Sequence, residues 1–152
     1  MTPNETILKR AFQLAQQAAK KDEVPVAAII YHSTTKEIIS YAYNKTEKKK
    51  NPLAHAEILA IEKACKKLKV KRLNGYSLFV TLEPCAMCAG AISWARLDAV
   101  FFGAFDQKTG GLCQGAQVFS HSQTHHKPFF KGGFDEEKNS QILTQFFKQK
   151  RK

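Results

Sequence analysis

Two apolar segments that flank one helix-forming segment constrain the fold of this chain most strongly. The segments "YSLFVTL" (76–82) and "AVFFGAF" (99–105) are continuous apolar runs of strand length, and "PCAMCAGAISWA" (84–95) between them favours a helix. Strands that a helix connects in this way pair in parallel, because the crossover carries the chain back to the edge where the first strand began. The sequence therefore predicts a sheet with parallel strands and helices on its faces.

The N-terminal part predicts one helix followed by a β-hairpin. Thr2 and Pro3 are typical of a helix start, and an apolar stripe continues to about Lys20. The segments "VPVAAIIY" (24–31) and "EIISYAYN" (37–44) are rich in β-branched and aromatic residues and enclose a short polar turn. We expect these two strands to pair antiparallel, so that the whole sheet is mixed.

Two further helices are expected. Asn51 and Pro52 are typical of a helix start, and the side chains expected on the buried face of this helix are Ile58, Leu59, Ile61, Ala64, Cys65 and Leu68. Residues 106–133 read as a glycine-rich loop. Residues 134–152 then predict a basic amphipathic helix with Ile142, Leu143, Phe146 and Phe147 on its apolar side.

Composition limits the class of protein. The length of 152 residues and the 43% of hydrophobic residues favour a single domain, 1–152, with a real core. No signal-peptide pattern follows Met1 and no run reaches membrane-spanning length, so we expect a cytoplasmic protein without a membrane partner. The net charge of +11 gathers in residues 45–50, 66–72 and 148–152. Such clusters favour a polyanionic partner, although solvated lysine-rich faces would look the same.

The cysteine pair in "TLEPCAMCAG" indicates metal or redox chemistry, because four cysteines are too few for a disulfide scaffold. Cys85 and Cys88 are expected at the N-terminal end of a helix, where the helix dipole favours thiolates. The segment "AHAEI" supplies His55 as a possible third ligand and Glu57 as a nearby carboxylate that is displaced around the helix. These features together favour a metal over a thiol–disulfide pair.

Three protein ligands leave one position of tetrahedral zinc open for water, which is typical of a catalytic site. Cys113 and the histidines of "HSQTHH", namely His121, His125 and His126, could be considered for a closed site, but their loop lacks a ligand pairing. Zinc makes hydroxide available near neutral pH, and Glu57 can move the proton to a ring nitrogen and a leaving amine. The pattern predicts hydrolytic chemistry.

The order H-x-E and then P-C-x-x-C is the signature of zinc nucleobase deaminases. The segments "VPVAA", "YNK", "HAEI" and "TLEPCAMCAGA" look like this superfamily, and the whole chain resembles the bacterial tRNA-specific adenosine deaminases. The resemblance implies a cytidine-deaminase-like, three-layer α/β/α fold with a central five-stranded mixed sheet. It also implies one Zn²⁺ per subunit, a homodimer, and conversion of the wobble adenosine of a tRNA anticodon stem-loop to inosine by attack on adenine C6.

The resemblance also assigns roles to individual residues of this chain. It makes His55, Cys85 and Cys88 the zinc ligands and Glu57 the proton shuttle. The residues that it places against the base or the anticodon loop are Asn44, Ala56 as a backbone donor, Asp106, Lys108, Phe147 and Arg151. Two of these have structural alternatives, because Asn44 could simply end a strand and Phe147 could belong to the core.

Two other functions use the same residues. A deaminase of free guanine, cytosine or a nucleoside has identical zinc chemistry. Its substrate carries no phosphates, however, so the basic clusters would have nothing to bind. A catalytically silent RNA-binding subunit would have no need of Glu57. The sequence therefore favours RNA editing over either alternative.

Overall fold

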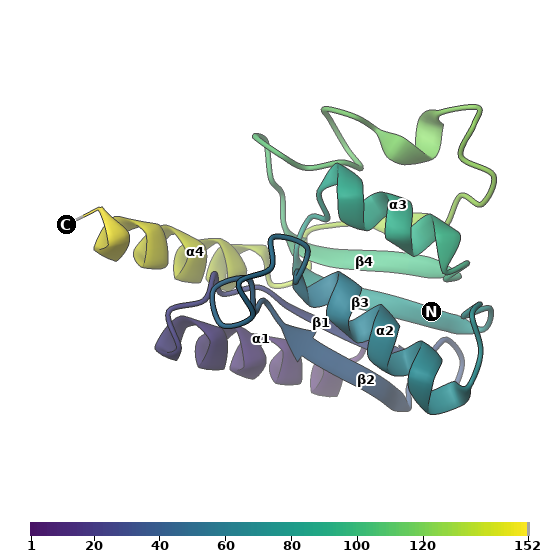
Figure 1. Cartoon of the computed structure of the whole chain (residues 1–152), viewed down its shortest axis with the longest axis horizontal. Coiled ribbons are helices and arrows are strands. Elements are labelled where there is room, and N and C mark those ends of the chain that lie inside the picture. Colours follow the sequence, from purple (N-terminus) through teal and green to yellow (C-terminus); the bar gives the residue numbers. More distant parts are fainter. Residues whose placement is uncertain (152) are drawn as a thin grey trace.

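The computed structural model describes residues 1–151 (Figure 1). The elements in chain order are α1 (Glu5–Lys20), β1 (Ala27–His32), β2 (Ile38–Tyr43), α2 (Ala56–Leu68), β3 (Tyr76–Leu82), α3 (Ala86–Trp94), β4 (Ala99–Ala104), a 3₁₀ turn η1 (Val118–Ser120), β5 (Phe129–Lys131) and α4 (Glu136–Lys150). No helix within the described residues is long and apolar enough to cross a membrane.

The strands form one mixed sheet in the order β2-β1-β3-β4-β5. β1 pairs antiparallel with both β2 and β3, and β3 and β4 pair in parallel across α3. β5 adds a second parallel pair at the far edge. The predicted hairpin, the predicted parallel pair and the five-stranded mixed sheet are therefore confirmed.

Helices cover both faces of the sheet, which confirms the three layers. α2 and α3 lie together on one face, and α1 lies behind the sheet, where it contacts α4 (Figure 1). Alternate residues of β1 supply the two cores: Ala28 and Ile30 pack toward α2, whereas Ile29 and Tyr31 pack toward α1. All four side chains are fully buried. A central strand buried on both sides explains the unbroken apolar run in the sequence.

Two helices begin later than the sequence predicts. Asn4, not Thr2, caps α1, because Asn4 Oδ1 accepts the N–H of Ile7 at 2.9 Å. The second helix does not begin at Asn51, because the Asn51 side chain accepts the N–H of Leu53 at 2.9 Å and forms a turn. α2 begins only at Ala56, and its fully buried side is made mainly of alanines, with the larger predicted side chains half-buried.

The fifth strand lies inside the segment that the sequence predicts to be a loop. β5 has only three residues, and Phe129 is exposed at 55%. Its backbone pairs with Ala99, Val100 and Phe101 of β4. A strand this short leaves no periodic pattern in the sequence, because its placement depends on the neighbouring strand.

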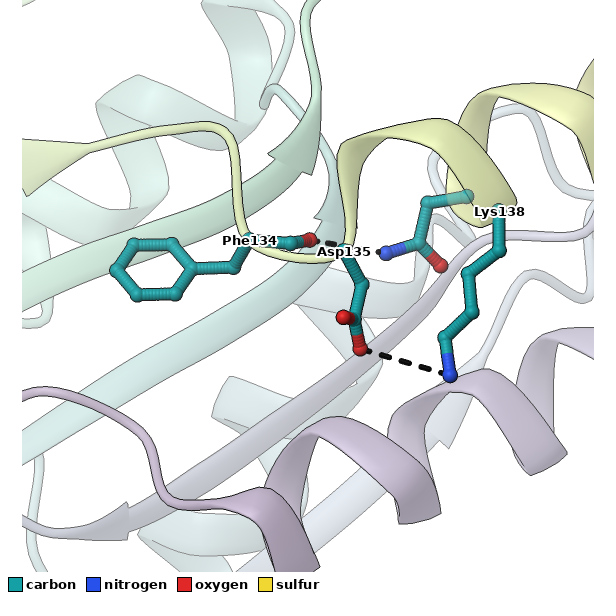
Figure 2. Close-up of polar contacts among 4 residues, drawn as sticks. Phe134, Asp135 and Lys138 are labelled. Atoms are coloured by element: carbon teal, nitrogen blue, oxygen red, sulfur yellow. Dashed lines mark hydrogen bonds and ion pairs between the residues drawn. The ribbon is translucent and has the colours of Figure 1, made fainter.

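The start of α4 is fixed by contacts shown in Figure 2. Asp135 pairs with Lys138 at 3.5 Å, and the buried Asn139 donates an amide N–H to the carbonyl of Phe134 at 3.2 Å. The Lys138 ammonium also lies 4.7 Å from the ring centre of Phe12 on α1. A Cβ on Gly103 would collide with Asn139, so β4 and α4 approach closely only because position 103 is glycine. These contacts set the direction in which α4 leaves the sheet.

Candidate metal centre and substrate groove

The first residues of α2 and α3 bring the candidate ligands together. His55 is the N-cap of α2 and Cys85 is the N-cap of α3, with Cys88 in the first turn of α3. An N-cap side chain ordinarily accepts a bond from its own helix, yet neither His55 nor Cys85 does so. Both side chains are therefore free to face the other helix. Pro84 stands just before the cap and so lies outside the helix, whereas the sequence predicts it in the first turn.

The three donor atoms have the spacing of a tetrahedral site. His55 Nδ1 lies 3.7 Å from Cys85 Sγ and 3.5 Å from Cys88 Sγ. Ordinary zinc–sulfur and zinc–nitrogen bond lengths at a tetrahedral angle separate these atom types by about 3.6 Å, so the donor set fits zinc. Among residues 1–151 this is the only group of three His, Cys, Asp or Glu side chains close enough to share an ion. Cys113 and the loop histidines lie outside it.

The electrostatics of the three ligands favour a cation between them. A hydrogen bond from Cys88 lowers the pKa of Cys85 to about 4. The same bond, together with burial and the charge of Glu57, raises the pKa of Cys88. The bond to Cys85 also raises the pKa of His55. The three donors thus compete for protons at close range, and a divalent ion that displaced these protons would satisfy both sulfurs.

Glu57 lies beside this group but not within it. The side chain is only 4% exposed, and burial is the main reason that its pKa rises to about 7. The Glu57 charge is one cause of the raised pKa of the Cys88 thiol, so the two groups lie near each other. Glu57 is absent from the set of mutually close donors within residues 1–151. Its role beside a metal stays a prediction.

Asn44 links the end of β2 to the start of α2. Its Oδ1 accepts the N–H of Ala56 at 2.7 Å and so caps α2 from a distant segment. This bond orients the amide, so Nδ2 is the group left to donate to a ligand. The Ala56 N–H is already engaged, and its predicted role as a donor to the base or to water requires it to be shared with Asn44. Both ligand-binding roles stay predictions.

The remaining predicted contact residues line one groove between the loop after β4 and helix α4. The groove has a volume of about 300 Å³, and its walls include Asp106, Lys108, Phe147 and Arg151. Phe147 is 41% exposed, whereas Phe146 is only 9% exposed. Phe146 is therefore the core residue of this pair. The Asp106 carboxylate accepts the N–H groups of Lys108 and Thr109, each at 3.0 Å, and therefore shapes the loop.

Sequence reasoning missed Glu83, which ties the ligand-bearing turn to this loop. Glu83 Oε1 accepts the N–H of Asp106 at 3.1 Å, and Oε2 accepts those of Leu112 at 3.1 Å and Cys113 at 2.9 Å. The side chain is only 4% exposed. A charged residue directly after a buried strand and before "PC" was the available signal, because a buried carboxylate needs donors close by.

Gly111 allows the same loop to pack on the start of α3. Its N–H donates to the carbonyl of Pro84 at 2.7 Å. A Cβ at position 111 would lie 2.8 Å from the nitrogen of Ala86 and 2.9 Å from the carbonyl carbon of Cys85. Only glycine permits this approach, so the loop supports the turn that carries the cysteines.

Comparisons with known proteins agree with this site. Residues 3–151 match the MafB19-like deaminase family. The curated tRNA-specific adenosine deaminase of Rickettsia bellii is 42% identical over 141 residues, which cover 93% of this chain and 97% of that protein. That of Bacillus subtilis is 41% identical over 154 residues, covering 100% and 93%. A solved structure from studies of A-to-I editing by tRNA:A34 deaminases superposes with a TM-score of 0.89 at 38% identity, covering 92% and 100%.

Proposed function

Because the chain belongs to the MafB19-like deaminase family, we propose that it deaminates the wobble adenosine of tRNA anticodon loops to inosine. The observation that carries the proposal is the match to curated tRNA-specific adenosine deaminases at 41–42% identity over more than nine-tenths of the chain. The His55, Cys85 and Cys88 group supports it independently, because it has the donors and spacing of a hydrolytic metal site. We take residues 1–152 as one deaminase domain.

The metal in this proposal is one zinc ion held by His55, Cys85 and Cys88. Two sulfurs and one imidazole are donors that zinc prefers, and three ligands leave one coordination position open. Bound zinc supplies the reaction with a water whose pKa is lowered toward neutrality. The helix N-termini that carry Cys85 and His55 orient the ligands before any ion arrives.

Glu57 is the proposed proton shuttle. Its carboxyl group is buried beside Cys88, so it can receive a proton from the attacking water and deliver it to a nitrogen of the adenine ring. A second transfer moves a proton to the leaving amine at C6, which departs as ammonia. The low exposure of Glu57 keeps bulk water from competing for these protons.

Asn44 and the groove beside α4 supply the proposed RNA contacts. Asn44 Nδ2 is oriented by the bond between Oδ1 and Ala56, and it can donate to an acceptor on the extruded nucleotide. The exposed ring of Phe147 can stack on a loop base, while Lys108 and Arg151 bring positive charge to the same groove. The groove thus offers a site for an anticodon loop and no evident use for a free base.

The proposed compartment is the cytoplasm. We also propose a homodimer, which the outer side of α3 supports. Met87 and Trp94 are exposed at 37% and 83%, and Gly90 lies between them on the same side of the helix. This exposed apolar side is continuous with the first turn that carries Cys88. We propose that a second copy of the chain covers it, since large exposed apolar side chains beside a site mark protein interfaces.

One experiment tests the function. The purified protein is incubated with an anticodon stem-loop that carries a wobble adenosine, and separately with free adenosine, cytidine and guanine, and the products are measured by mass spectrometry. Inosine from the stem-loop alone supports the proposal. A stem-loop with guanosine at the wobble position is the matched control. Turnover of only a free base or nucleoside would refute the proposal that RNA is the substrate. It would leave the proposed zinc mechanism in place.

A further inference from the structure

The exposed edge of the sheet at β2 carries an ordered row of lysines. β2 is the first strand of the sheet and has no partner on its outer side within the described residues. The Lys63 ammonium donates to the carbonyl of Tyr41 at 3.1 Å, and the Lys67 ammonium donates to the carbonyl of Ile39 at 3.3 Å. Both lysines come from α2, which runs beside β2 (Figure 1). Positive charge is thereby held at alternate residues along the edge.

Two further cations lie at this edge, each over the ring of a tyrosine of β2. The guanidinium of Arg10 lies 4.9 Å from the ring centre of Tyr41, on which Lys63 also rests at 5.9 Å. The ammonium of Lys45 lies 5.2 Å from the ring centre of Tyr43. We name the four cations, Arg10, Lys45, Lys63 and Lys67, the edge strip.

The positive charge of the edge strip is not neutralised within the protein. None of its four members forms an ion pair with a carboxylate among residues 1–151. Burial, followed by the charges of Lys63, Lys48 and Lys49, lowers the pKa of Lys45. The acids nearest to the strip in sequence are Glu47, two residues after Lys45, and Glu62, directly before Lys63, and both are exposed. The strip therefore presents concentrated positive charge to the solvent.

The strip begins at the candidate active site and leads away from it. Lys45 directly follows Asn44, whose side chain accepts the N–H of Ala56 at the start of α2, next to His55. Lys67 lies twelve residues after His55, which corresponds to about 18 Å along an α-helix. Three of the cations contact β2 at alternate residues, Ile39, Tyr41 and Tyr43, and alternate residues of a strand lie about 7 Å apart. A chain of phosphates entering the site could follow this edge.

We propose that the edge strip binds the sugar-phosphate backbone of tRNA outside the anticodon loop. The identity of this polyanion rests on the proposed function. Repeated, unneutralised cations on an exposed surface release counterions when phosphates replace them, which is the main source of sequence-independent RNA affinity. The strip is distinct from the groove beside α4, because β2 lies at one edge of the sheet while α4 packs on β4.

A purely structural role makes a different prediction. Lysines also protect an exposed edge strand from pairing with another chain. Glutamine separates the two roles, because it keeps a polar side chain beside the edge strand but carries no charge. The test variant is therefore Lys63→Gln with Lys67→Gln. The matched control is Lys127→Gln with Lys131→Gln, which removes the same charge beside β5 at the opposite edge.

Binding of full-length tRNA and of its anticodon stem-loop is measured against salt concentration for the parent and both variants. If two phosphate contacts are lost, the slope of log K against log salt should fall by about 1.5 to 2 for full-length tRNA, with Kd weakened roughly tenfold. The loss should be smaller for the stem-loop, which is too short to follow the whole strip. The control pair should change the slope by less than half as much.

Equal slopes for the test and control pairs would overturn the proposal, as would an equal loss on the stem-loop and on full-length tRNA. Inosine formation by the parent is measured in the same samples. A parent that binds tRNA through the strip but forms no inosine would retain this inference and refute the proposed function.

Discussion

Replacing Glu83 by glutamine should destabilise the protein far more than its conservative chemistry indicates. The carboxylate accepts three backbone N–H groups, from Asp106, Leu112 and Cys113. Glutamine retains one oxygen, so its best orientation keeps two bonds, now without charge, and turns an NH₂ group toward the third donor. Loss of one charge-assisted bond and weakening of two others should cost about 3–4 kcal/mol of unfolding free energy.

Urea unfolding followed by circular dichroism measures this cost. The midpoint should fall while the m-value stays constant, because the change removes bonds without altering the area exposed on unfolding. In a thermal scan the same loss should lower Tm by roughly 10 °C. We also expect kcat/KM on the stem-loop to fall, since Glu83 joins the turn before Cys85 to the loop that contains Lys108.

Glu62→Gln is the control, because it makes the same chemical change at an exposed carboxylate on α2. Its effect should lie within about 0.5 kcal/mol of zero. If Glu83→Gln were as stable as this control, the three N–H bonds would not be what holds the two segments together, and the positioning argument would fail.

Four further substitutions test the site and its surroundings. Glu57→Gln should keep the metal and the fold but lower kcat at least a hundredfold; a parental rate would remove Glu57 as the shuttle. Cys88→Ser should lower zinc content by elemental analysis, and full occupancy would exclude Cys88 as a ligand. Phe147→Ala should raise KM for the stem-loop with little effect on stability, because the ring is 41% exposed. If the protein forms the proposed dimer, Trp94→Glu should shift its sedimentation toward that of a monomer, and an unchanged profile would place the interface elsewhere.

The strands and the ligand spacing were predictable because they depend on local patterns. The runs at 76–82 and 99–104 are largely buried on both faces, so hydrophobicity alone marks them. The second run ends one residue earlier than predicted, because Phe105 is 44% exposed. The predicted convergence of His55 with the cysteines followed from one rule, that helices which follow strands of the same direction begin at the same end of a sheet. β2 and β3 run in the same direction on either side of β1, and the separations of 3.5 and 3.7 Å agree with that rule.

The features that sequence reasoning missed depend on contacts between distant segments. Asn51 looked like a helix start because the same side chain caps helices and forms turns, and only its bond to Leu53 decides between them. β5 exists because β4 offers it an edge, not because its three residues favour a strand. Glu83 reads as an isolated charge until the donors of Asp106 and Cys113 are folded against it.

The N-cap position of the metal-binding side chains has a consequence for folding cooperativity. His55 is 30 residues from Cys85 in the sequence, and the intervening chain contains α2 and β3. An ion held by both would link the starts of two helices and lower the conformational entropy of the unfolded chain, as a disulfide of this span does. The folded state would gain roughly 3–4 kcal/mol of stability. A chelator would then act as a denaturant, loosening α2 and α3 together. Supply of metal during synthesis would govern the yield of folded protein as well as its activity.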